Sequence, residues 1–268
     1  MKKYFRKLNL YLHHRRYHLS IKELLVYDTI MRFKPKEREL MGKKIYFFLD
    51  KEKLEEGLRC AKEKYGLRFT DLSAVTEVFL DGIYSVYEDF IPGKGQTVID
   101  VGAQYGDYTI LCNKIYGSKV YAFEPLPQNF REIKKNLRLN GLQNSDSIKI
   151  FNVALADKNR SGTADYANNM VNNMGEGTKI KIRFRTLDSY GFKPDILKID
   201  VEGFEIGVLK GAMNTIKKYR PKIIIETHGD ELEKKVKDIL TDQGYTLKQR
   251  GRSIFNKEFG KVTNLFFV

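Results

Sequence analysis

The 268-residue chain has only two cysteines, no tryptophan and no long apolar run. Cys60 and Cys112 are far apart, so they offer neither a disulfide framework nor a thiolate metal cluster, which fits a reducing compartment. No stretch approaches the roughly 20 apolar residues that a membrane-spanning helix needs. The N-terminus, MKKYFRKLNLYLHHRRYHLS, lacks the apolar segment and the cleavage site of a secretory signal. We therefore expect a cytoplasmic protein without a transmembrane segment.

The charge of the chain is strongly positive and unevenly distributed. The formal net charge is +14, and the first 50 residues contain 13 Lys and Arg against 5 Asp and Glu. Such a basic arm attracts nucleic acid, anionic lipid or an acidic protein, although a solvated Lys-rich surface has the same composition. Within the arm, Arg15 and Arg16 interrupt the histidines of HHRRYH, which favours an electrostatic role over a metal site. No other residue pattern suggests a catalytic metal.

The sequence pattern changes near residue 95. The part before it carries mainly helical signals, and the part after it alternates strands with helices, which predicts an α/β fold with a parallel sheet covered on both faces. The last two predicted strands are joined by GRSIFNKEFGKVT, which is too short for a helical crossover, so one of them should run antiparallel. The strand segments are TVIDVG, KVYAFEP, IKIFNVAL, DILKIDVEG, PKIIIET, YTLKQR and NLFFV.

The turn after the first of these strands, in VIDVGAQYGDYTI, has the features of a ligand site. Gly102 and Gly106 permit a tight turn and a close approach of the backbone to a ligand. A dinucleotide site requires G-x-G-x-x-G, but position 104 is Gln104. Asp100 lies two residues before the first glycine, where a carboxylate would repel a pyrophosphate and attract a cation. S-adenosyl-L-methionine, with a sulfonium and an ammonium and no phosphate, fits this turn.

The second strand of this part ends in Glu124, 18 residues after Gly106. An acid at this position accepts hydrogen bonds from the hydroxyls of an adenosine ribose. A dinucleotide site would also place an acid there. The distinction between S-adenosyl-L-methionine and a dinucleotide therefore rests on Asp100 and Glu124 together with the missing glycine.

Several segments in this order resemble the FkbM family of S-adenosylmethionine-dependent methyltransferases. They are VIDVGAQYGDYTI, VYAFEPLPQNF, FNVALAD, RTLDSYGFKPDILKIDVEGFEIGVLKGA and RPKIIIETHG. The resemblance covers about residues 75–268 and implies the Rossmann-like class I fold, a seven-stranded, mostly parallel sheet with one antiparallel strand. We expect a methyltransferase domain over residues 71–268 and a basic, mainly helical extension over 1–70. Gln104 and Tyr105 depart from the family pattern.

The resemblance implies roles for individual residues. Asp100, Gly102, Ala103 and Gly106 would line the methionine end of the cofactor. Glu124 would hold the ribose, with Pro125 on the adenine side, and Ala154 and Asp157 would flank the adenine. Asp200 would lie next to the transferred methyl group, and Glu202 and Glu205 belong to the same motif.

Methylation of a hydroxyl also requires a base, and two residues at strand ends are candidates. These are Asp200 and His228, with Glu202 and Glu226 as neighbours, and we expect catalytic roles for Asp200, His228 and Glu202. Two alternatives remain open. Asp200 would orient the cofactor ammonium, and Glu202 and Glu205 would cap the following helix. The fourth strand ends in IDVEGFE rather than an N-P-P-Y-type turn, which argues against methylation of adenine or glutamine.

Three functions remain open at this point. The first is O-methylation of a hydroxyl on a sugar or small metabolite, which many family members perform. The second is methylation of a nucleic acid, with RNA or another polyanion bound by the basic arm. The third is a cofactor-binding module without turnover. The polar stretch of residues 166–179 is either a lid over the site or a hairpin turn. Nothing in the sequence indicates an oligomeric state.

Overall fold

The computed structural model describes residues 54–70, 74–167, 170–172, 178–256 and 260–268. Residues Glu56–Val268 form one compact unit. The basic arm, including HHRRYH, lies outside the described residues, so the division of the chain at residue 70 and the role of the arm stay predictions. None of the helices in the described part is long and apolar enough to cross a membrane.

A seven-stranded sheet forms the centre of this unit, in the order β10-β11-β9-β8-β1-β2-β3. β3, β2, β1, β8 and β9 are mutually parallel, whereas β11 is antiparallel to both β9 and β10. This confirms the predicted class I sheet with one antiparallel strand. The strands are β1 (Thr97–Val101), β2 (Lys119–Phe123), β3 (Ile148–Phe151), β8 (Ile196–Ile199), β9 (Lys222–His228), β10 (Leu247–Asn256) and β11 (Gly260–Phe267).

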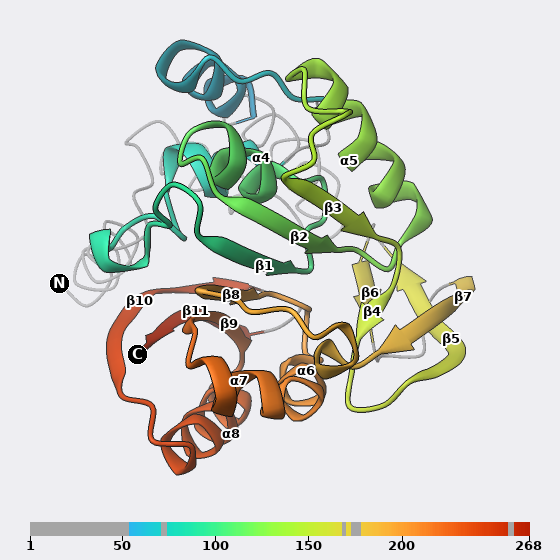
Figure 1. The fold of residues 1–268 in the computed structure, drawn as a ribbon, viewed down its shortest axis with the longest axis vertical. Helices are drawn as coiled ribbons and strands as arrows, with labels where there is room; N and C mark the ends of the chain where they lie inside the picture. Colours follow the sequence, from blue (N-terminus) through green and yellow to red (C-terminus); the bar gives the residue numbers. More distant parts are fainter. Residues whose placement is uncertain (1–53, 71–73, 168–169, 173–177, 257–259) are drawn as a thin grey trace, which may run out of the picture. The chain divides into compact units, whose positions relative to one another are not determined.

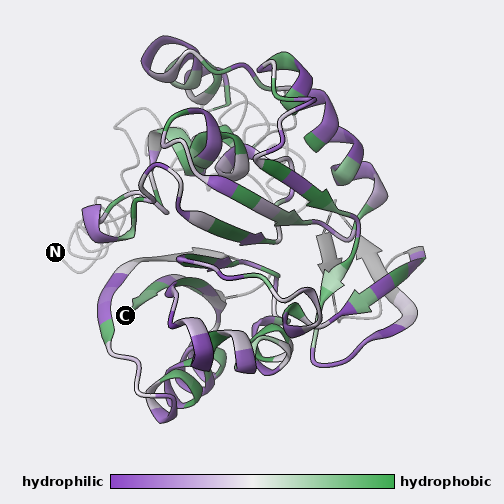
Figure 2. Ribbon diagram, viewed as in Figure 1, coloured by the Kyte–Doolittle hydropathy of each residue, from purple (hydrophilic) through white to green (hydrophobic). Residues whose placement is uncertain are grey.

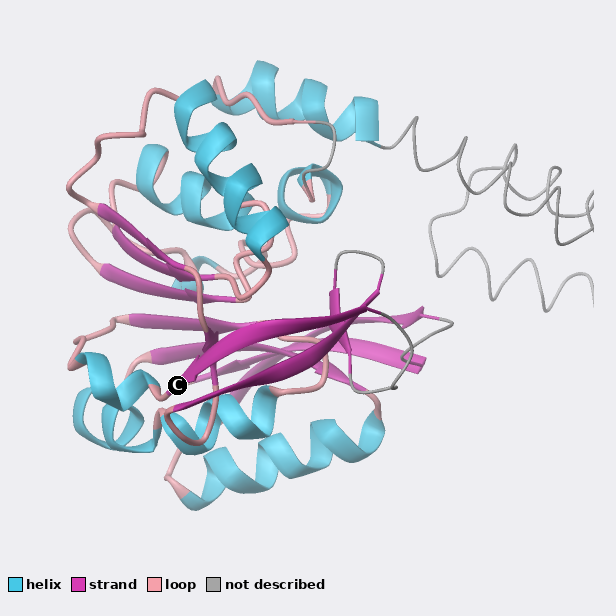
Figure 3. Ribbon diagram, turned by 90° about the vertical axis from the view of Figure 1, so that its right-hand side faces the viewer, coloured by secondary structure: helices cyan, strands magenta, loops and turns pink. Residues whose placement is uncertain are grey.

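Helices cover both faces of the sheet (Figures 1 and 3). On one face lie α4 (Asp107–Lys114) and α5 (Pro127–Leu139), and on the other lie α6 (Glu205–Gly211), α7 (Met213–Tyr219) and α8 (Asp230–Asp242). The strands are predominantly apolar, and α5 and α8 alternate apolar with polar residues (Figure 2). Alternate strand residues such as Ile99 and Val101 pack with Val208 and Val236 in a fully buried core. Burial of these apolar side chains holds the helices against the sheet.

The segment before β1 packs against the α4 and α5 face of the sheet. It contains a helix over 54–65 and two short turns, η1 (Thr76–Leu80) and η2 (Glu88–Phe90). The amides of Arg68 and Thr70 donate to the side-chain oxygens of Asn140 and Asn136 on or next to α5, at 3.0 and 2.9 Å. Further along, the ring of Tyr84 meets that of Tyr108 edge to face, with centroids 5.1 Å apart.

A second, four-stranded sheet has the order β4-β7-β5-β6. Its strands are β4 (Ala154–Leu155), β5 (Arg160–Ala167), β6 (Met170–Asn172) and β7 (Thr178–Arg185), and the turn η3 (Leu187–Tyr190) follows. The predicted single strand IKIFNVAL is therefore wrong, because it divides into β3 and β4 on different sheets. Asn152 lies at the break, and its amide donates to the carbonyls of Glu124 and Pro125, both at 2.9 Å.

The polar stretch of residues 166–179 belongs to this second sheet. β5 and β6 pair antiparallel, as a hairpin does. Residues 168–169 and 173–177 lie outside the described residues, so a lid role for this stretch stays a prediction.

Candidate functional site

The turn between β1 and α4 holds the end of β1 against both neighbouring strands. Gly102 has φ +77°, and a Cβ at this position would lie 1.7 Å from the carbonyl oxygen of Asp200. The amides of Gly102 and Ala103 both donate to the carbonyl of Phe123 at 3.0 Å. Only glycine fits at position 102, because any side chain would collide with the backbone after β8.

The rest of this turn leads into α4 and contacts the end of β2. Gly106, with φ +84°, precedes the first residue of α4. Gln104 also has a positive φ of 47°, which is unfavourable for a residue with a side chain. Its amide donates to Oε2 of Glu124 at 2.9 Å, so the turn and the predicted ribose-binding residue are directly connected.

Glu124 follows β2 and is 4% exposed. Its Oε1 accepts from the amide of Leu126 at 2.9 Å and from Nδ2 of Asn129 at 3.3 Å. Burial raises the pKa of Glu124 to about 7, although these hydrogen bonds and that from Gln104 oppose the change. Pro125 lies beside it, and its carbonyl accepts from Asn152.

Asp100 and Lys198 are partners in register on the adjacent parallel strands β1 and β8. Both are buried, and Lys198 Nζ lies 3.2 Å from Asp100 Oδ1 and 2.8 Å from the carbonyl oxygen of Gly102. Burial alone would lower the pKa of Lys198, but the charges of Asp100 and Asp200 outweigh it and raise the pKa. Asp100 also accepts a 2.6 Å hydrogen bond from the hydroxyl of Thr109. Lys198 was not predicted, although a lysine inside the apolar run DILKI is a usable signal.

Asp200 follows β8, one step closer to the carboxyl edge of the sheet. Its Oδ2 accepts from the hydroxyl of Tyr84 at 2.7 Å and lies 3.8 Å from Lys198 Nζ. The Lys198 ammonium also lies over the ring of Tyr84, 5.1 Å from its centroid. Tyr84 therefore brings the segment before β1 into the site, a contact that sequence analysis missed.

His228, the last residue of β9, is surrounded by three carboxylates. Its Nε2 lies 3.1 Å from Glu202 and 3.4 Å from Glu226, and its Nδ1 lies 3.2 Å from Glu205. Burial would lower the pKa of His228, but hydrogen bonds to the three carboxylates outweigh it and raise the pKa far above its usual value. A raised pKa favours the protonated imidazole, so the predicted role of His228 as a base stays a prediction.

Glu226 is positioned from two sides. Its Oε1 faces His228, and its Oε2 accepts from Nδ2 of Asn264 on β11 at 2.9 Å. Burial and the nearby charge of Asp200 raise the pKa of Glu226 to about 7. A carboxylate with this pKa is suited to proton transfer at neutral pH.

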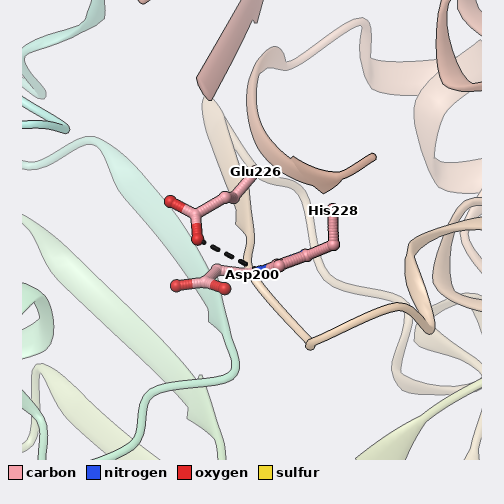
Figure 4. A group of neighbouring side chains, drawn as sticks. All are labelled: Asp200, Glu226 and His228. Atoms are coloured by element: carbon pink, nitrogen blue, oxygen red, sulfur yellow. Dashed lines mark ion pairs between the residues drawn. The ribbon is translucent and has the colours of Figure 1, made fainter. Parts of the chain in front are cut away.

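Three of these side chains converge closely enough to be considered as metal ligands (Figure 4). One ligand atom each from Asp200, Glu226 and His228 lies within 4.8 Å of the others. Sequence analysis grouped these three residues as candidate bases and their neighbours, not as metal ligands. Lys198 and the protonated His228 already place two positive charges beside these carboxylates, which disfavours a bound cation. The predicted absence of a metal stays a prediction.

Ala154 and Asp157 do not join this group. Ala154 lies in β4 and packs against Ile182 and Phe184, while Asp157 is exposed beside α6. Both belong to the second sheet or its border, so their predicted place beside the adenine stays a prediction. The other predicted residues meet at the carboxyl ends of β1, β2, β8 and β9.

Residues 100–247, more than half of the chain, match the model of the methyltransferase FkbM domain. The chain belongs to the FkbM methyltransferase family. A putative methyltransferase of Jannaschia sp. is 26% identical over 190 residues, which cover 61% of this chain and 67% of that protein. The hexuronic acid methyltransferase AglP of Haloferax volcanii is 30% identical over 155 residues, covering 53% of this chain and 60% of AglP.

A solved structure supports the same fold. The FkbM methyltransferase of Methylobacillus flagellatus superposes with a TM-score of 0.50 at 16% identity, covering 80% of this chain and 58% of that one. The FkbM chain described here therefore has the class I methyltransferase fold. It spans about two thirds or less of the length of these three proteins.

Proposed function

We propose that this FkbM methyltransferase uses S-adenosyl-L-methionine to methylate a hydroxyl group on a sugar or small metabolite. The observation that carries the proposal is the cluster of Asp200, Glu226 and His228 beside the Gly102 turn, at the carboxyl edge of the sheet. Ligands of open α/β sheets bind at this edge. The similarity to a hexuronic acid methyltransferase supports a sugar as the acceptor.

The residues present fit S-adenosyl-L-methionine. Glu124 accepts three hydrogen bonds from other groups of the chain, and a carboxylate can accept about four. One acceptor position therefore remains for a ribose hydroxyl. Asp100 is paired with Lys198, so Glu124 and Asp200 would supply the negative charge that suits a sulfonium and an ammonium. Gly102, Ala103 and Gly106 keep the turn close to the ligand position, and Pro125 would border the adenine side.

When bound, the cofactor supplies an activated methyl group, so the chain must mainly orient the acceptor and remove its proton. Asp200 and Glu226 are the carboxylates placed for this task, because both lie at strand ends and Glu226 has a pKa of about 7. His228 and Glu202 would act together as a fixed ion pair that positions Glu226 and contacts the acceptor.

Titration calorimetry with S-adenosyl-L-methionine, and separately with NAD, tests the cofactor. We expect binding of the former and a loss of about 1–3 kcal/mol in Glu124→Gln, because the ribose hydroxyls lose a charged acceptor. Glu231→Gln, an exposed change on α8, is the matched control and should bind normally. Equal affinity of wild type and Glu124→Gln would contradict the ribose-binding role, and preferential binding of NAD would contradict the cofactor.

The net charge of +14 keeps RNA methylation as a second candidate. It predicts that RNA binding weakens steeply between low and moderate salt, with methyl transfer to the bound RNA. Salt-independent binding would remove this candidate. Cofactor binding without methyl transfer to sugars, metabolites or RNA would instead indicate the non-catalytic module.

A further inference from the structure

Strand β7 of the second sheet carries a row of cations on one face. Lys179, Lys181, Arg183 and Arg185 alternate with Ile180, Ile182 and Phe184. Ile182 and Phe184 are buried against Ala154 and Ala156, whereas Lys179, Lys181 and Arg183 are exposed. Because strand side chains alternate between faces, the cations follow one another at about 7 Å along a single face. We call Lys179, Lys181 and Arg183 the cationic row.

The neighbouring strand places two hydroxyl residues on this face, and one acid, Asp165, in register with Lys179. In the register between β5 and β7, Ser161 lies opposite Arg183 and Thr163 lies opposite Lys181. Both hydroxyl residues are exposed. The guanidinium of Arg160 instead lies over the ring of Phe184, 4.1 Å from its centroid, on the opposite face. The face of the cationic row therefore offers charged and neutral hydrogen-bond donors to solvent.

The cationic row lies on the functional side of the molecule. Figures 1 and 3 show the second sheet beyond the carboxyl ends of β1, β2 and β3, where the predicted cofactor residues are. Arg183 donates to the carbonyl of Asn152 at 3.3 Å, and Asn152 in turn contacts the backbone of Glu124. At the same end, β7 pairs with β4, whose following residue Ala156 packs closely against Gly211 of α6. The row thus begins next to the cofactor edge and runs away from it.

We propose that the cationic row binds the methyl acceptor, and that this acceptor is an acidic oligosaccharide with several carboxylate groups. This inference rests on the proposed function and adds its substrate class. Regularly spaced cations match a chain with regularly spaced anions, and Ser161 and Thr163 suit sugar hydroxyls. Among the described side chains on this face of β5 and β7, none is aromatic, whereas single-stranded nucleic acids are held largely by stacking on aromatic rings.

The test compares two triple variants of the full chain. The first, Lys179→Gln/Lys181→Gln/Arg183→Gln, removes the row. The control, Lys193→Gln/Lys217→Gln/Lys218→Gln, removes the same charge from exposed positions near the starts of β8 and β9. The probes are hexagalacturonic acid, neutral maltohexaose and hexauridylate RNA, measured by calorimetry at low and moderate salt. Binding of S-adenosyl-L-methionine is measured on every protein.

We expect the wild type to bind hexagalacturonic acid more tightly than either other probe. The row variant should lose about tenfold or more of this affinity and show a weaker salt dependence, while the control should lose less than about twofold. Equal losses in both variants, no preference for the acid over maltohexaose, or a row-dependent preference for the RNA would each overturn the proposal. Cofactor binding separates the two claims: if the wild type does not bind S-adenosyl-L-methionine, the proposed function fails whatever the row binds.

Discussion

At the scale of single residues, the site is built from charged groups that compensate one another. Lys198 contacts Asp100 and Asp200, and His228 contacts Glu202, Glu205 and Glu226. Buried charges are tolerated only when they are paired and hydrogen-bonded, so each of these side chains fixes the orientation of its neighbours. This arrangement supports the proposal that His228 positions its neighbours and that the carboxylates transfer the proton.

Glu226→Gln tests this assignment. A base works only when deprotonated, so the rate of methyl transfer in the wild type should rise as pH increases through about 7, the pKa of Glu226. The substitution keeps the hydrogen bond with Asn264 but removes the base, and we expect the rate to fall by about 10²–10⁴-fold. The pH–rate profile of wild type and variant is the measurement. A variant that keeps the rise near pH 7 would place the base elsewhere, with Asp200 as the next candidate.

At the scale of elements, one carboxylate attaches α8 to the C-terminal hairpin. Glu233 of α8 accepts from Nε and Nη2 of Arg250 on β10, at 3.1 and 2.9 Å, and Lys261 on β11 lies 3.4 Å away. The Arg250 guanidinium lowers the pKa of Glu233 to about 2, with Lys237 adding to the effect. Because β11 and β9 pair closely, this attachment also stabilises the strand that carries Glu226 and His228.

The pH dependence of stability tests this attachment. The pKa of Glu233 is below its unperturbed value of 4.5, so its stabilisation is present above about pH 4.5 and is lost as pH falls toward 2. Glu233→Gln should lower the free energy of unfolding at pH 7 by about 1–3 kcal/mol and reduce its decline in acid. Urea unfolding at several pH values measures both. An unchanged acid decline would show that other carboxylates dominate it.

At the scale of the whole molecule, parallel strands deliver distant residues to one edge. Tyr84 and Asp200 are 116 residues apart in sequence and form a hydrogen bond. The carboxyl ends of β8 and β9 bring Asp200, Glu226 and His228 together, while β11 adds Asn264. We expect the total charge of this edge, rather than any single side chain, to decide which cation it accepts.

Metal binding tests this charge balance. Lys198 and the protonated His228 already offset the carboxylates, so we expect Mg²⁺, Mn²⁺ or Zn²⁺ to leave the melting temperature of chelator-treated protein unchanged. A ligand that binds the folded state would raise it. A rise with one of these ions that is absent in Asp200→Asn would instead assign a metal to Asp200, Glu226 and His228.

Local patterns were sufficient for the main sheet, the Gly102 turn and the positions of Asp100, Glu124, Asp200 and His228. Each depends on short-range chemistry: strand periodicity, glycine at a positive φ, or an acid at a strand end. The same patterns did not separate β3 from β4, because the break depends on the contact of Asn152 with the end of β2. They also did not reveal Lys198 or Tyr84 as site residues, since their partners lie on other elements.

The sequence by itself determined that this chain is an α/β protein with a cofactor-type turn and the motifs of FkbM methyltransferases. Only the tertiary structure decided that three carboxylates surround His228, that Lys198 pairs with Asp100, and that Arg183 of β7 contacts Asn152 next to Glu124. The physical reason is that strand and turn formation depend on neighbouring residues, whereas the protonation state and the electrostatic surroundings of a side chain depend on groups that only folding brings within a few ångströms.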